Sequence, residues 1–163
     1  MNKTLAKKIG MWKKADQKIR LSFNWPKDLK NKKKISRLRK IDDANYKKII
    51  DLISVYGYPT SKLVGKKAMK SFWLVIQHQN RHPGLQKACL KKCDFGKSEV
   101  AYLTDRILVH ENKKQIYGTQ FKLKNGRYVL CPLRNYTHVS KLRKSAGLES
   151  LETYLKRAGV SKK

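Results

Sequence analysis

The sequence predicts a mainly α-helical protein with one small β-hairpin, an α+β fold organised as a compact helical domain with a basic N-terminal extension. Apolar residues recur at helical spacing over most of the 163 residues. The spacing of the apolar residues changes once, around Asn125-Gly126, where two β-prone runs replace the helical pattern. Asn-Gly between such runs is the strongest short signal for a hairpin. The most basic stretch, residues 27–40, contains few core-forming residues and is therefore set apart from the rest.

Composition narrows the class of protein. An apolar fraction of 40% argues against wholesale disorder, and no apolar run approaches the roughly 18 residues that a membrane-spanning helix needs. The three cysteines are an odd number without a Cys-x-x-Cys pair, which excludes a disulfide scaffold or zinc ribbon and indicates a reducing compartment. The first residues lack the apolar core of a secretory signal. We therefore expect a cytoplasmic protein without membrane association.

The distribution of charged and apolar residues predicts three segments. Residues 1–40 are expected as a basic N-terminal helix and arm, residues 41–157 as the helical domain, and residues 158–163 as a basic tail. Within the first segment, Pro26 precedes the basic stretch 27–40, which we expect to be an exposed arm or loop with at most a short helix.

Apolar stripes and capping signals predict the helices. The stripe over residues 5–12 predicts an N-terminal helix, and the stripe over 46–53 predicts a second helix that ends at Gly57. Thr60 or Ser61 is expected to cap a single central helix that follows. Further helices are expected over about 83–93, 98–109 and 137–157, the last broken at Gly147.

The hairpin is expected over residues 115–131. Alternation along its first strand would place Gln115, Tyr117 and Thr119 on one face and Gln120 on the other. Gly118 lowers strand stability, so it marks a bulge or a close approach by a ligand or another backbone. Four hydrogen-bonding side chains in six residues suit recognition of a polar small molecule, and an ordinary polar strand face is the alternative.

Five ordered pieces of the chain resemble a bacterial domain family of unknown function. The pieces are ADQKIR at 15–20, YGYPTSKLVG at 56–65, FWLVIQHQNRHPGLQ at 72–86, AYLTDRILVHENKKQIYGTQ at 101–120 and KLRKSAGLESLETY at 141–154. They extend from Met11 to Tyr154, and their order and spacing make the resemblance specific. The resemblance implies a domain identity but no reaction.

The chain departs from this family's pattern at acidic positions. Asn80 and His82 stand where the resemblance leads us to expect acidic residues after the Gln-His pair. Arg134 and Asn135 replace an acidic pair after the proline of the hairpin. The replacement of acidic residues by neutral or basic ones argues against metal chemistry at these positions and favours attraction for an anion. Neither a metal nor a cofactor is therefore expected.

Three residues are candidate catalytic groups. His78 follows Gln77 late in the central helix, and histidine is the usual general base or acid near neutral pH. Asp105 would orient His78 and hold its tautomer, while the guanidinium of Arg106 would grip a carboxylate or phosphate. The alternatives are a histidine at the edge of the core and an Asp-Arg ion pair that braces the helix against the hairpin.

The predicted site is a concave polar pocket around these three residues. Its ligand-binding residues are expected to be Asp16, Gln17, Arg20, Gln77, Gln115, Tyr117, Thr119 and Gln120. Asp16 and Arg20 also have the spacing of a surface ion pair on a helix, which is their structural alternative. Cys89 and Cys93 share a helical face, but no second Cys/His pair is in register, so no metal site is expected. The sequence has no P-loop, dinucleotide-binding, metalloprotease or serine-hydrolase motif.

Forty basic residues against eleven acidic ones give a net charge of +29, which favours contact with a polyanion. The predicted nucleic-acid-binding residues lie in the basic stretch and are Lys30, Lys32, Lys33, Lys34, Arg37, Arg39 and Lys40. Phe23 and Trp25 precede them and can stack on bases. One hypothesis is therefore association with nucleic acid or another polyanion; a solvated basic surface is its structural alternative. The other is a metal-independent enzyme or binder of an anionic small molecule, using the pocket around His78.

Overall fold

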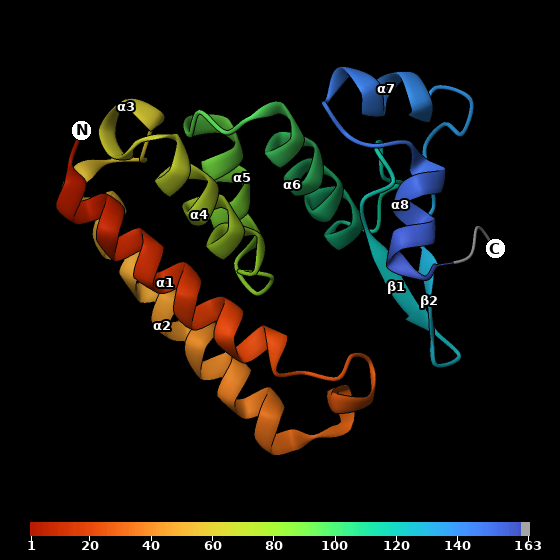
Figure 1. Cartoon of the computed structure of the whole chain (residues 1–163), viewed down its shortest axis with the longest axis horizontal. Coiled ribbons are helices and arrows are strands. Elements are labelled where there is room, and N and C mark those ends of the chain that lie inside the picture. Colours follow the sequence, from red (N-terminus) through yellow and green to blue (C-terminus); the bar gives the residue numbers. More distant parts are fainter. Residues whose placement is uncertain (161–163) are drawn as a thin grey trace. The chain divides into compact units, whose positions relative to one another are not determined.

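A computed structural model describes residues 1–160 of the chain. The chain divides into two compact units, Met1–Phe95 and Gly96–Lys163. Both are built mainly from helices, and the second also contains a two-stranded antiparallel hairpin (Figure 1). The predicted fold class, mainly α with a small hairpin, is confirmed.

Two long helices, α1 (Lys3–Leu21) and α2 (Lys32–Tyr56), lie side by side in the first unit (Figure 1). The side chain of Asn2 caps the start of α1 by accepting a hydrogen bond from the backbone N–H of Leu5. The buried residues Leu5 and Ile9 belong to the apolar stripe that predicted this helix. The N-terminal helix is therefore confirmed, and it packs on α2 and on α4 (Lys66–Gln77).

The basic stretch 27–40 is more regular than predicted. It forms a short 3-10 helix, η1 (Lys27–Lys30), and then the first turns of α2, which continue without a break past residue 40. Asn31 caps α2 through its side-chain oxygen, 3.1 Å from the backbone nitrogen of Lys34. Lysine and arginine are good helix formers, so their abundance does not oppose a helix here. The arm or loop expected over residues 32–40 is a helix.

The predicted central helix is divided in two. Thr60 caps α3 (Ser61–Val64), and α4 starts after Gly65, whose φ of +82° lies in the left-handed region. The break needs glycine for this conformation; the sulfur of Met1, 2.8 Å from where a Cβ would lie, belongs to a flexible exposed side chain that can move. The single helix predicted from Thr60 onwards is therefore wrong at this position.

The core of the first unit lies between α1, α2 and α4. Ile9, Ile49, Phe72, Val75 and Ile76 are fully buried there. Helix α5 (Pro83–Lys92) then packs on α4, and it starts at Pro83 as predicted from proline's preference for the first helical turn. The polar segment between α4 and α5 carries His78, which is the C-cap of α4 rather than a residue inside it.

The second unit begins with α6 (Lys97–His110) and continues into the hairpin of β1 (Phe121–Lys124) and β2 (Arg127–Leu130). Asn125 and Gly126 have φ of 50° and 75°, as a type I′ turn requires, so the predicted turn is confirmed. Helices α7 (Val139–Ser145) and α8 (Leu151–Ala158) follow, separated at Gly147 as predicted.

The segment 115–120 is not the first strand of the hairpin, as the sequence had suggested. The strand begins only at Phe121, and Gln115 makes an isolated bridge with Leu133. Backbone N–H groups of this segment bind the side chain of Asp105 instead of a neighbouring strand. Gly118, with φ of +72°, adds a left-handed residue that a regular strand does not contain. Of the predicted basic tail, residues 161–163 lie outside the described residues.

Candidate functional site

The predicted site residues fall into two groups, one in each unit. Asp16, Gln17 and Arg20 of α1 and Gln77 and His78 at the end of α4 belong to the first unit. Asp105, Arg106, Gln115, Tyr117, Thr119 and Gln120 belong to the second. Each group forms its own network of hydrogen bonds, and the networks differ in what they can do chemically.

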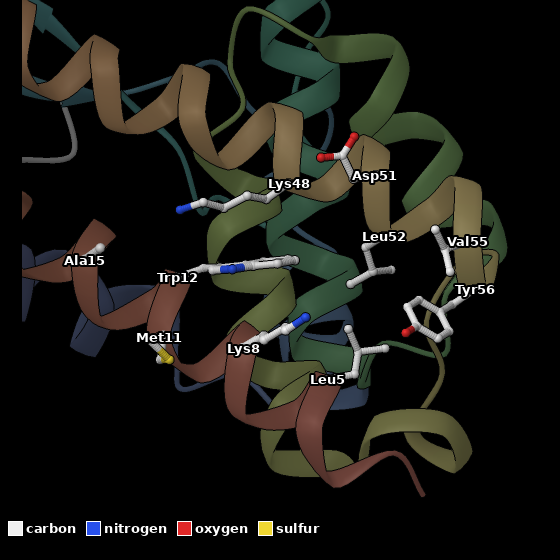
Figure 2. A pocket seen from close by; sticks show the side chains of 10 residues that line it. All are labelled: Leu5, Lys8, Met11, Trp12, Ala15, Lys48, Asp51, Leu52, Val55 and Tyr56. Atoms are coloured by element: carbon white, nitrogen blue, oxygen red, sulfur yellow. The ribbon is translucent and has the colours of Figure 1, made fainter.

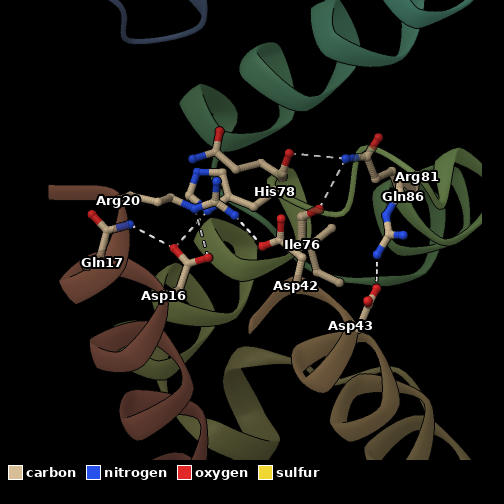
Figure 3. Close-up of polar contacts among 10 residues, drawn as sticks. Asp16, Gln17, Arg20, Asp42, Asp43, Ile76, His78, Arg81 and Gln86 are labelled. Carbon is tan, nitrogen blue, oxygen red and sulfur yellow. Dashed lines mark hydrogen bonds and ion pairs between the residues drawn. The ribbon is translucent and has the colours of Figure 1, made fainter. Parts of the chain in front are cut away.

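Asp16 is the centre of the first network (Figure 3). Its carboxylate is fully buried and accepts hydrogen bonds from Gln17 Nε2 at 2.9 Å and from Arg20 Nε at 3.0 Å. Nδ1 of His78 lies 2.8 Å from Oδ2 of the same carboxylate. Because a carboxylate only accepts, His78 donates through Nδ1, and in the neutral ring Nε2 then carries the lone pair. Asp16 therefore takes the orienting role that the sequence analysis had given to Asp105.

The surroundings of Asp16 favour its charged form. Burial by itself would raise the pKa of this carboxyl. The hydrogen bond and charge of His78, together with the charge of Arg20 and the hydrogen bond from Gln17, outweigh burial and hold the pKa below its ordinary value. Asp16 therefore remains an anion that fixes the imidazole ring near neutral pH.

Asp42 of α2 joins this network from the opposite side. Nη2 of Arg20 donates a short hydrogen bond to Asp42 Oδ1, so Arg20 bridges carboxylates from α1 and α2 (Figure 3). Burial raises the pKa of Asp42 to about 6, and the charge of Asp16 adds to the effect. The charges of Arg20 and Arg81 oppose this shift without cancelling it. The pKa values of these two neighbouring carboxyls are thus shifted in opposite directions, which is typical of sites that use both an acid and a base.

A pocket of about 220 Å³ opens beside this network. It is lined by Arg39, Asp42, His78, Gln79, Asn80, Arg81 and His82. Of these residues the sequence predicted His78 as catalytic and Arg39 as nucleic-acid-binding, whereas Asp42, Gln79 and Arg81 were assigned to no site. The signal that could have found Gln79 and Arg81 is the uninterrupted polar run from Gln77 to His82, which separates two helices.

Two contacts hold the segment between α4 and α5 against α2. The ring of His82 stacks on Tyr46 with centroids 3.6 Å apart, and Arg81 pairs with Asp43 (Figure 3). On the inner side, Nε2 of Gln86 donates to the backbone oxygens of Ile76 and Gln77, both at 3.2 Å. Gln77 thus contributes its carbonyl to the end of α4. The contacts of Arg81, His82 and Gln86 hold the turn that carries the pocket residues from Gln79 to His82.

The second network is centred on Asp105, which is fully buried on α6. Its oxygens accept hydrogen bonds from the backbone N–H groups of Ile116, Tyr117 and Thr119 at 2.7 to 3.1 Å. The hydroxyl of Thr119 adds a bond of 3.0 Å. This carboxylate therefore organises the backbone of 116–119.

A buried cation completes the same network. Arg143 of α7 is 1% exposed, and its Nη1 donates to the carbonyl oxygens of Tyr117 and Gly118 at 2.6 and 3.3 Å. Its guanidinium lies 4.9 Å from the ring centre of Tyr154. The carboxylate of Asp105 thus binds N–H groups of residues 116–119, and the guanidinium of Arg143 binds carbonyl groups of the same segment. Arg143 could not be predicted from the sequence, because a basic residue in so basic a chain carries no local signal of burial.

The remaining predicted residues of the second unit also make internal hydrogen bonds. Gln115 is buried, and its Nε2 donates to the carbonyls of Gln120 and Cys131 at 3.1 and 2.7 Å. Nε2 of Gln120 donates to Thr119 Oγ1 at 3.0 Å, and Arg106 is half-buried on α6. These contacts stabilise the loop, and they favour the structural alternative for this polar segment.

Comparison with known proteins identifies the family. A family model described as a family of unknown function, DUF6624, matches residues 4–160. The chain belongs to this family. The resemblance to an uncharacterised domain family is thereby confirmed. No curated protein and no solved structure matches the chain.

The surface of this DUF6624 chain is strongly basic in the first unit. Basic side chains are exposed along α1, η1 and the first half of α2, and they include Lys7, Lys13, Lys14, Lys18, Lys30, Lys32, Lys33, Arg37, Arg39 and Lys40. Lys34 differs from the other predicted nucleic-acid-binding residues, because its Nζ lies 2.5 Å from Asp28 and 5.8 Å from the ring centre of Phe23. Lys34 therefore contributes to the fold.

A groove of about 650 Å³ lies between α1 and α2 (Figure 2). Its walls are mostly apolar and include Leu5, Trp12 and Leu52, with Lys8 and Lys48 among the lining side chains. None of the predicted site residues lines it.

Within the part of the chain that the structure describes, no helix is long and apolar enough to span a membrane. No group of three or more His, Cys, Asp or Glu side chains in residues 1–160 is arranged to hold a metal ion.

Proposed function

We propose that the protein binds nucleic acid through the exposed basic residues of α1, η1 and the first half of α2, without reading base sequence. The observation that carries the proposal is the uncompensated charge of residues 1–48. All four acidic side chains of this stretch pair with other side chains of the protein: Asp16 with Arg20 and His78, Asp28 with Lys34, Asp42 with Arg20, and Asp43 with Arg81.

Only Arg20 and Lys34 among the basic residues of this stretch pair with an acid in the described part of the chain. The other lysines and arginines keep their charge for an external anion. Neutralising phosphates with such residues releases counterions, which is the main source of sequence-independent affinity for nucleic acid.

An aromatic pair supports the same proposal. Trp25 is 40% exposed and stacks on the buried Phe23 with ring centroids 4.6 Å apart. Lys27 and Lys30 of η1 follow it in the chain after Pro26. An exposed indole beside cations is the arrangement that binds single strands, because bases stack on the ring while phosphates meet the charges.

The test is the affinity for a fluorescent single-stranded RNA, measured by anisotropy over a range of salt concentrations. One variant changes Lys30, Lys32, Lys33, Arg37 and Lys40 to Gln, and the charge-matched control changes Lys122, Lys124, Lys141, Lys144 and Lys156 to Gln, all exposed in the second unit. Glutamine preserves helix propensity, so folding is little affected.

We expect the first variant to reduce the slope of log affinity against log salt by up to about 3.5, given roughly 0.7 per neutralised phosphate contact on single strands. The control should change the slope far less. Absence of micromolar binding at low salt would reject the proposal, and equal slopes in the two variants would reject the assignment to α1, η1 and α2.

A second function is supported by the Asp16–His78 hydrogen bond. We propose that the pocket beside His78 holds a small polar ligand and that His78 acts there as a general base, with Asp16 as its positioning residue. A buried carboxylate on Nδ1 keeps the tautomer whose Nε2 can accept a proton.

A thermal-shift screen with a metabolite library, followed by turnover assays on each stabilising compound, tests the second function. Replacing His78 by Asn should lower turnover by about 100-fold or more, the usual range for a general base. The matched control is His110→Asn, since His110 is exposed at the end of α6. Equal turnover in the two variants would reject His78 as the base.

A further inference from the structure

We propose that the pocket formed by Arg39, Asp42 and the segment from His78 to His82 binds a phosphate group. The inference rests on the second proposed function only in that the pocket holds a ligand, and it does not require His78 to act as a base. It names the chemical class of that ligand.

The size and lining of the pocket fit a compact oxyanion. Its volume of about 220 Å³ is below the roughly 300 to 1,000 Å³ of pockets that enclose larger organic ligands. Arg39 and Arg81 line the pocket, and the planar donors of a guanidinium group match the oxygens of phosphate. Arg39 makes no ion pair with an acid in residues 1–160, and Arg81 pairs with Asp43 through Nη2, which leaves its other donors.

Gln79 provides an independent indication of a ligand. It lines the pocket and is only 2% exposed, and its Nε2 has no hydrogen-bond partner among the described residues. A buried N–H donor without an acceptor costs free energy, so such groups in native proteins usually meet a ligand or water. A phosphate oxygen is the acceptor that this amide lacks.

The start of α5 adds to the positive potential. The lining residues Gln79 to His82 lead directly into this helix, His82 is its N-cap, and no side chain among residues 1–160 caps its first turn. Pro83 has no N–H, and the N–H groups of Leu85 and Gln86 bind the carbonyl of His82, so the contribution of this ten-residue helix is the partial positive charge of its dipole, which favours an anion nearby.

Asp42 is the one acidic side chain that lines the pocket. It is faced by Arg20 and Asp16 from α1 and by Arg81 from the segment before α5, and His78 and His82 line the same pocket. Because burial raises the pKa of Asp42 to about 6, it becomes a neutral hydrogen-bond donor in mild acid. The pocket should therefore hold an anion more tightly at pH 5 than at pH 8. Sulfate, whose charge does not change over this range, is the probe for this dependence.

The main test titrates inorganic phosphate into the full chain while NMR follows the side-chain amide of Gln79. Arg39→Gln removes a lining cation, and Lys40→Gln is the matched control, because Lys40 is the adjacent exposed cation and does not line the pocket. We expect Arg39→Gln to weaken phosphate binding about tenfold and Lys40→Gln less than about twofold. Gln79→Glu should abolish binding by placing a like charge at the amide.

Absence of saturable binding to the wild-type chain would overturn the proposal, and so would equal effects of Arg39→Gln and Lys40→Gln. If Gln79→Glu does not fold, as judged by circular dichroism, the Arg39 and Lys40 variants decide the question. Competition separates the sources of the group: a nucleoside monophosphate carries a phosphomonoester, and a dinucleoside monophosphate carries only a diester. Displacement by the first indicates a small ligand, and displacement by the second indicates a nucleic-acid backbone.

The outcomes separate this inference from both proposed functions. The variant with Lys30, Lys32, Lys33, Arg37 and Lys40 changed to Gln keeps every pocket-lining residue. It should therefore lose RNA affinity while retaining affinity for phosphate. Phosphate binding that depends on Arg39, without any turnover in the library screen, would reject His78 as a base and keep the phosphate site.

Discussion

Replacing Asp105 by Ala should remove much of the stability of the second unit. The carboxylate accepts bonds from three backbone N–H groups and one hydroxyl, and alanine leaves all four donors without this acceptor. The N–H of Thr119 is buried, while those of Ile116 and Tyr117 are part-buried. Leaving a buried donor unsatisfied costs about 1–3 kcal/mol. One full penalty for Thr119 and two partial penalties for Ile116 and Tyr117 give a loss of about 4 kcal/mol in the free energy of unfolding.

Asp105→Asn refines this prediction. Asparagine keeps the shape and one accepting oxygen, but its NH₂ group faces donors and cannot accept from them. We expect a loss of about 2 kcal/mol, between wild type and Asp105→Ala. Asp51→Asn is the matched control, because Asp51 is exposed on α2 and should change the free energy of unfolding by less than about 0.5 kcal/mol.

Urea unfolding followed by the NMR resonances of the second unit measures these differences. A loss below about 1 kcal/mol in Asp105→Ala would refute the assignment of Asp105 as the organiser of residues 116–119. It would also reopen a direct role for this carboxylate in ligand binding.

Three further predictions concern glycine, cysteine and pH. Gly118→Ala should destabilise the protein by about 1–3 kcal/mol in thermal unfolding, since the φ of Gly118 is +72° and a Cβ would lie 2.9 Å from a methyl group of Leu151. The control Gly84→Ala, in open space at the start of α5, should be neutral or slightly stabilising. Iodoacetamide at pH 8, read by mass spectrometry, should label the half-buried Cys93 before Cys89, because a hydrogen bond to Cys93 and burial raise the pKa of the Cys89 thiol; faster labelling of Cys89 would contradict this. Because the fold raises the pKa of Asp42 from 3.8 to about 6, the contribution of Asp42 to stability is full below pH 4 and is lost as pH rises through 6. Urea unfolding at pH 4 and 7 should show a loss of up to about 3 kcal/mol in the wild type that Asp42→Asn abolishes, and an equal loss in the variant would contradict the prediction.

Local signals predicted most helices because each signal acts within a few residues. Proline at the start of α5 and Asn-Gly in the hairpin fix backbone dihedrals without help from the rest of the fold. The break at Gly65 was not predicted, because the apolar stripe runs through it and the positive φ that requires glycine is visible only in the structure. The segment 115–120 was misassigned because residues far away in sequence, Asp105 and Arg143, take its hydrogen bonds.

The candidate site followed the same rule. His78 was identified from its residue type and position, and Asp16 and Arg20 were expected among the ligand-binding residues of its pocket. The choice of its carboxylate partner required tertiary structure, since Asp16 is 62 residues away in sequence. Asp42 and Gln79 were missed because neither residue type suggests a site until burial separates it from water.

The loop between α6 and β1 should exchange its amide protons as slowly as a helix does, although it contains neither helix nor strand. The N–H of Thr119 is buried and bound to a carboxylate on one side of the chain, while Arg143 holds the adjoining carbonyls of Tyr117 and Gly118. Exchange at Thr119 therefore requires both ions to separate from the loop, which demands opening of α6 and α7 together rather than local fraying. In a protease digest of the native protein, this loop should resist cleavage while the exposed hairpin turn at Asn125-Gly126 is cut.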